Sequence, residues 1–86
     1  MKEKLSEFVQ QLIQEKWGDQ YALADILSQE YGYSLIFTNK KDQNRFSPTM
    51  IPSRWVYDFF VKKSDVARRK IEIEVEVAFD KEVISG

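Results

Sequence analysis

The sequence predicts a small α+β domain in which an N-terminal helical hairpin packs on a short antiparallel sheet. Two observations carry this prediction. Apolar residues recur with the period of a helix up to Gly32, and with the period of a strand after it. The chain has 86 residues, which is the length of one domain. We therefore expect residues 1–86 to share a single core.

The segment over residues 2–17 has the spacing of an amphipathic helix, because its apolar residues recur every three or four positions. Gly18 is expected to end this helix, since glycine adopts the left-handed C-cap conformation without strain. Asp19 is placed to cap a second helix, which would run to Gly32. Its apolar stripe comprises Ala22, Leu23, Ile26 and Leu27. The connection is short, so the two helices should form a hairpin.

The segment over residues 33–38 is rich in β-branched and aromatic residues, which is typical of a strand. A polar turn follows over residues 39–44. A second extended segment is expected over residues 45–51, where Pro48 permits a strand only at the edge of a sheet. Residues 53–63 fit both a helix and a strand. Ser53, placed directly after Pro52, favours a third helix there.

The run over residues 71–79 alternates strictly between apolar residues and glutamates. This pattern predicts a strand with one face in the core and the other in water. We expect the strand to pair antiparallel with residues 33–38. Its water-facing row would consist of Glu72, Glu74 and Glu76. The residues expected to meet in one core are Leu12, Ile26, Ile36, Ile73 and Val75.

The charge of the chain is segregated along the sequence, although the formal net charge is only −1. Residues 39–70 carry nine cations against three carboxylates, and the segments on either side are acidic. A basic block of this kind predicts an anionic partner. The alternative is that these cations solvate turns or pair with the acidic ends of the same fold. The candidate binding residues are Lys40, Lys41, Arg45, Arg54, Lys62, Lys63, Arg68, Arg69 and Lys70.

Two functions fit this charge pattern. The first is a small non-catalytic protein that regulates or inhibits a protein or nucleoprotein partner through its charged surfaces. Phages and mobile elements encode many such proteins. A second copy of the chain, forming a homodimer, would suit opposed patches equally well. The row Glu72, Glu74 and Glu76 is an alternative acidic contact face that would imitate phosphates.

The second function is a regulator that binds DNA or RNA through the basic block. Gln43 and Asn44 would reach base edges, and Phe46, Trp55 and Tyr57 would stack on bases. The spacing Leu23-Ala24-x-x-Leu27, followed by Gly32, resembles the first helix and turn of a helix-turn-helix or winged-helix unit. The residues after Ser34 depart from that pattern, because they are typical of a strand rather than of a recognition helix.

The composition argues against catalysis. The chain has no His and no Cys, so it lacks the commonest general base, the commonest metal ligand and any disulfide. It has no glycine-rich phosphate loop. We therefore predict no catalytic site, no metal and no cofactor. No run approaches the ~20 apolar residues of a membrane span, and the N-terminus does not resemble a secretory signal. The expected location is the cytoplasm, away from the membrane.

Overall fold

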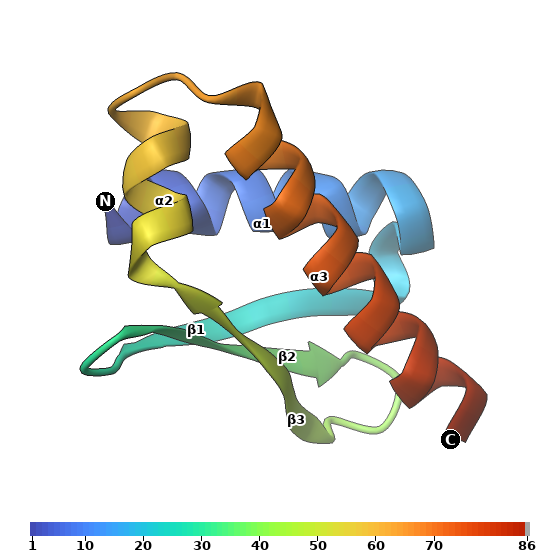
Figure 1. The fold of residues 1–86 in the computed structure, drawn as a ribbon. Coiled ribbons are helices and arrows are strands. Elements are labelled where there is room, and N and C mark those ends of the chain that lie inside the picture. The colour runs from blue at the N-terminus through green and yellow to red at the C-terminus, as the bar shows by residue number, and fades with distance from the viewer. Residues whose placement is uncertain (86) are drawn as a thin grey trace.

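The computed structural model describes residues 1–85, and for residues 48 and 83–85 it describes the backbone alone. The α+β class predicted from the sequence is confirmed (Figure 1). The elements are α1 (Lys2–Trp17), a 3₁₀ turn (Gly18–Gln20), β1 (Tyr21–Ser28), β2 (Gly32–Asn39), β3 (Arg45–Pro52), α2 (Ser53–Phe60) and α3 (Asp65–Ser85).

The three strands form an antiparallel sheet in the order β1-β2-β3, so β2 is hydrogen-bonded on both sides. The register between β1 and β2 runs from Tyr21 opposite Asn39 to Ser28 opposite Tyr33, with an irregularity between Leu23 and Asp25. All three helices lie over one face of the sheet, and the other face is open (Figure 1).

The core lies between the helices and the covered face of the sheet, and Phe79 of α3 is at its centre. The ring of Phe79 is 4.6 Å from that of Trp17, 4.9 Å from Tyr21, 4.8 Å from Phe37 and 5.5 Å from Phe46, centroid to centroid. These contacts join α3 to the end of α1 and to all three strands. Aromatic pairs at such distances add to the stabilisation that burial alone provides.

The predicted second helix of the hairpin is wrong, because residues 21–28 form the strand β1. Gly18 ends α1 as expected, with a φ of 67°, but the chain then turns into the sheet. Tyr21, Leu23 and Ile26 pack toward the core, and the irregularity after Leu23 shifts the inward positions from alternate residues to Ile26. Their spacing fits a helix as well as a bulged strand, and the pairing with β2 decides between them.

The predicted strand over residues 71–79 is also wrong, because this run lies within α3. Ser64 begins the helix: its Oγ accepts a hydrogen bond from the backbone N–H of Ala67 at 3.2 Å, as an N-cap residue does. The buried residues of α3 follow the helical period, and they are Ala67, Ile71, Val75, Ala78 and Phe79.

Three other predictions from the sequence are confirmed. Residues 33–38 lie in β2, and residues 45–51 lie in the edge strand β3. The third helix predicted over residues 53–63 is α2, although it ends at Phe60. Of the five predicted core residues, Leu12, Ile26 and Val75 are buried.

The other two predicted core residues, Ile36 and Ile73, are not buried. Leu35 and Phe37 of β2 point into the core, so Ile36 between them faces the open side of the sheet. Ile73 lies on the solvent side of α3, where it is 45% exposed.

Candidate binding surfaces

The nine candidate cations do not form one surface. Lys40, Lys41 and Arg45 lie at the turn between β2 and β3, and Arg54 lies in the first turn of α2. Lys62 and Lys63 lie in the connection from α2 to α3, and Arg68, Arg69 and Lys70 lie in the first two turns of α3. Figure 1 shows these two connections at opposite ends of α3. The rise of 14 helical residues from Arg68 to Glu82 separates them by about 21 Å. Each end of the molecule must therefore be considered as a separate candidate site.

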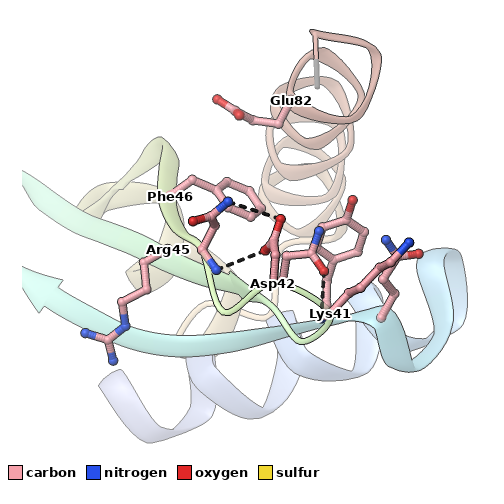
Figure 2. Close-up of a pocket in the computed structure, with 9 residues that line it drawn as sticks. Lys41, Asp42, Arg45, Phe46 and Glu82 are labelled. Carbon is pink, nitrogen blue, oxygen red and sulfur yellow. Dashed lines mark hydrogen bonds between the residues drawn. The ribbon is translucent and has the colours of Figure 1, made fainter.

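The β2–β3 end has a hollow of about 840 Å³, shown in Figure 2. Its polar groups build the turn rather than converge on a ligand. The Asp42 carboxylate accepts hydrogen bonds from the backbone N–H and the side-chain amide of Asn44, at 3.0 and 3.1 Å. The side chain of Arg45 points away from Asp42 (Figure 2). These contacts are typical of an Asx turn, and this hollow is the weaker candidate.

The described residues show no cluster of metal-ligating side chains and no buried polar or charged side chain. No group of three or more carboxylates among them is placed to hold a metal ion.

The predicted acidic row does not exist as a row, because its residues lie on a helix. Glu76 pairs with Lys16 of α1 at 3.2 Å, and Glu72 pairs with Arg69 at 3.2 Å. Glu74 is placed differently and lines a groove beside Trp55. The three glutamates are half-buried, which contradicts the prediction of a fully solvated face. Glu76 connects α3 to α1, and Glu72 pairs within α3, so neither belongs to a row that imitates phosphates.

The cations of the α2–α3 end are partly matched by carboxylates of the same chain. Lys62 Nζ is 3.9 Å from Asp58 Oδ1, and Arg68 is 3.8 Å from Asp65. Both pairs are long and solvent-exposed, so they hold the cations only weakly. The structure thus supports part of the alternative weighed from the sequence, in which cations pair within the fold.

Lys63 differs from its neighbours, because no ion pair of the described residues includes it. Its backbone φ is 58°, in the left-handed region that costs a residue with a Cβ about 1–2 kcal/mol. A glycine would relieve that strain. The side chain of Lys63 is exposed in the connection between the two helices.

Exposed apolar side chains accompany these cations. Tyr57 and Val61 are four positions apart at the solvent side of α2, and they are 49% and 47% exposed. Lys62 Nζ lies 5.9 Å from the centroid of the Tyr57 ring. We define the α2–α3 surface by its exposed residues, which are Tyr57, Val61, Lys62, Lys63 and Arg68.

From the sequence, Tyr57 is expected only to stack on bases and Val61 has no expected role, although the helical spacing places both on one exposed side. In a helix that begins at Ser53, burying Val56 places Tyr57 and Val61 outside the core-facing arc. Apolar residues outside that arc, next to cations, indicate a contact surface.

None of the helices described in the structure is long and apolar enough to cross a bilayer. Comparisons of the chain with protein-family models, with curated proteins and with solved structures found no match. The functional argument therefore depends on the surfaces of this chain.

Proposed function

We propose that the protein is a non-catalytic, cytoplasmic binding protein that docks on an acidic surface of a protein partner and thereby regulates or inhibits that partner. The observation that carries the proposal is the mixture of exposed apolar and cationic side chains on the α2–α3 surface. Tyr57 and Val61 are each about half exposed beside Lys62 and Lys63. Exposed aromatic and aliphatic groups next to charge are typical of the centre and rim of a protein interface.

The same mixture favours a protein partner over nucleic acid. Lysine and arginine serve either partner, but an exposed valine offers no hydrogen bond to a phosphate or a base edge and could contact only the methyl group of a thymine. The side chains that the sequence offers for base contacts are also dispersed. Gln43 and Asn44 lie at the β2–β3 turn, while Trp55 belongs to α2. The helix-turn-helix interpretation is wrong, because the residues that suggested its first helix form β1.

The left-handed backbone conformation of Lys63 supports a binding role for its charged side chain. A residue with a Cβ keeps a left-handed conformation at a cost in stability. The turn itself would favour glycine at this position, so the charge of the side chain is the better explanation for a lysine there. Of the three cations of the α2–α3 surface, Lys63 is the one that the described ion pairs leave free for a partner.

The test begins with photo-cross-linking in host cells through a benzoylphenylalanine residue placed at Val61. The same residue at Gln11, which is exposed on α1, provides the control. A protein captured at position 61 and not at position 11 is then purified. Its affinity is measured for the wild-type chain and for two charge-reversal variants.

We expect Lys62→Glu combined with Lys63→Glu to weaken binding at least about tenfold, because the new carboxylates face an acidic surface. Lys40→Glu combined with Lys41→Glu makes the same change of charge at the other end of the molecule and should leave binding nearly unchanged. Equal losses in both variants would contradict the proposed surface. Binding of labelled DNA or RNA that falls steeply with salt, with no captured protein, would instead establish the nucleic-acid function.

A further inference from the structure

The helix α3 has a second apolar face that the core does not cover. Its buried side includes Ile71 and Val75. On the opposite side lie Val66, Ile73 and Val77, which are 66%, 45% and 47% exposed. At about 100° per residue, positions 66, 73 and 77 fall within a narrow arc of the helix. We call these three residues the outer stripe.

The outer stripe borders a groove that carries two opposite charges. Trp55 of α2 forms one wall of a groove of about 300 Å³, and Lys70, Ile73, Glu74 and Val77 of α3 form the rest. Lys70 Nζ lies 5.9 Å from the centroid of the Trp55 ring. Neither Lys70 nor Glu74 belongs to an ion pair of the described residues. Both charges are therefore available to a partner that covers the stripe.

The positions along α3 make this face complementary to itself. The midpoint of Lys70 and Glu74 is position 72, and the midpoint of Val66 and Val77 lies between positions 71 and 72. Ile73 lies within about 2 Å of the same level along the helix axis. In two antiparallel copies of α3 related by a two-fold axis near position 72, residues at equal distances from the axis would therefore be complementary. Valine would meet valine, Lys70 would meet Glu74 of the second copy, and Ile73 would meet itself.

We propose that the protein forms a homodimer through antiparallel packing of α3 on α3. A closed two-fold interface requires a self-complementary patch, and the charge pattern selects the antiparallel direction. In a parallel pair Lys70 would face Lys70, and Glu74 would face Glu74. The apolar contact is smaller than the about 800 Å² per partner of a standard interface. The dimer should therefore dissociate on dilution, with a dissociation constant of roughly micromolar order.

The first test is sedimentation velocity of the full chain from about 1 μM to about 500 μM, which brackets a micromolar constant. We expect the wild-type chain to shift from monomer to dimer over this range. Ile73→Glu should abolish the shift, because two carboxylates would meet at the axis. Met50→Glu is the control, since Met50 is 43% exposed on β3. Its side chain lies outside the outer stripe, and the variant should dimerise like the wild type.

The second test reverses the charges singly. Lys70→Glu and Glu74→Lys should each weaken self-association at least tenfold, because like charges then face each other across the axis. An equimolar mixture of these two variants should recover a dimer, since each new charge then faces its opposite in both symmetry-related pairs. A parallel pair would recover in the same mixture, but its single variants would not lose affinity, because like charges already face each other in its wild-type form. The loss in the single variants therefore identifies the antiparallel direction, and the recovery in the mixture shows that the loss is due to the charges.

Several results would contradict the proposed dimer. A wild-type chain that stays monomeric at the highest concentration would overturn it, as would a dimer that survives Ile73→Glu. Loss of the dimer in Met50→Glu with retention in Ile73→Glu would place the interface on the sheet instead. Failure of the mixture to associate better than the single variants would exclude the antiparallel register. Circular dichroism of each variant ensures that the comparison is made between folded chains.

Discussion

Ile73 and Val75 are neighbours in an alternating run, yet the first is 45% exposed and the second is fully buried. On a strand, residues two positions apart share a face, whereas on a helix they are about 200° apart. The alternation that suggested a strand thus distributes the apolar residues of α3 between two opposite sides. The difference in burial should be measurable for single side chains.

We expect Ile26→Ala to lower the free energy of unfolding by about 2–5 kcal/mol, because it removes a buried side chain and leaves a cavity. Ile73→Ala should change it by no more than about 0.5 kcal/mol, since this residue lies at the surface. Urea unfolding of both variants at low protein concentration measures the two values. A large loss for Ile73→Ala would indicate that this residue faces the core.

A second pair of residues separates the effect of backbone strain on stability from the effect of the side chain on partner binding. Lys63 and Gln43 both adopt a left-handed backbone, with φ of 58° and 64°. Lys63→Gly and Gln43→Gly should each raise the free energy of unfolding by up to about 1 kcal/mol, because glycine relieves the Cβ strain. Only Lys63→Gly should weaken binding to the captured partner. Denaturant midpoints and affinities of both variants provide the measurement. Equal affinities would show that the Lys63 side chain does not contribute to partner binding.

At the scale of the elements, the beginning of α3 is decided by a short local pattern. The Ser64 Oγ accepts a hydrogen bond from the Ala67 N–H at 3.2 Å, and Asp65 places a carboxylate in the first turn. Both features favour a helix N-terminus. The helical spacing from Ala67 to Phe79 agrees with them. Read together, cap and spacing predict a helix even though the segment alternates strictly between polar and apolar residues.

We expect Ser64→Ala to destabilise the protein by about 1 kcal/mol, the usual effect of losing an N-cap. Ser28→Ala provides a matched control, because Ser28 is exposed at the end of β1 and should tolerate the change. Thermal unfolding followed at a helix wavelength compares the two variants. If Ser64→Ala melts with the wild type, the cap does not contribute to the stability of α3.

At the scale of the whole molecule, β2 connects the parts of the fold. It pairs with β1 on one side and with β3 on the other, and its residues Leu35 and Phe37 are fully buried. Phe79 packs on Phe37 at 4.8 Å and so connects the sheet to the C-terminal helix. This arrangement predicts one cooperative unit centred on β2, with turns that open independently.

Hydrogen exchange followed by NMR should show the slowest amides in β2, with an opening free energy close to that of global unfolding. Amides of the β2–β3 turn and of the α2–α3 connection should exchange faster, because these segments are exposed. A slower edge strand β1 than the central strand β2 would contradict this account of the cooperative core.

The sequence by itself determined the α+β class, the helix α1 with its end at Gly18, and the strands β2 and β3, and it favoured a helix from Ser53 over the strand that the same residues also fit. These elements have local patterns of period or capping that one conformation satisfies best. It also identified the cations that the structure places at the α2–α3 end. Those charges had to remain accessible to water in any fold.

Only the tertiary structure decided residues 21–28 and 71–79. The first segment fits a helix and a bulged strand equally well, and the backbone partners that β2 supplies make it a strand. The second segment alternates as a strand does, but its helical face packs against α1 and the sheet, where Phe79 contacts Trp17 and Phe37. Burial of that face stabilises α3 more than an alternating strand face would, and it leaves the outer stripe facing solvent. The division of the cations between two ends of the molecule follows from the same choice, because α3 separates the two connections.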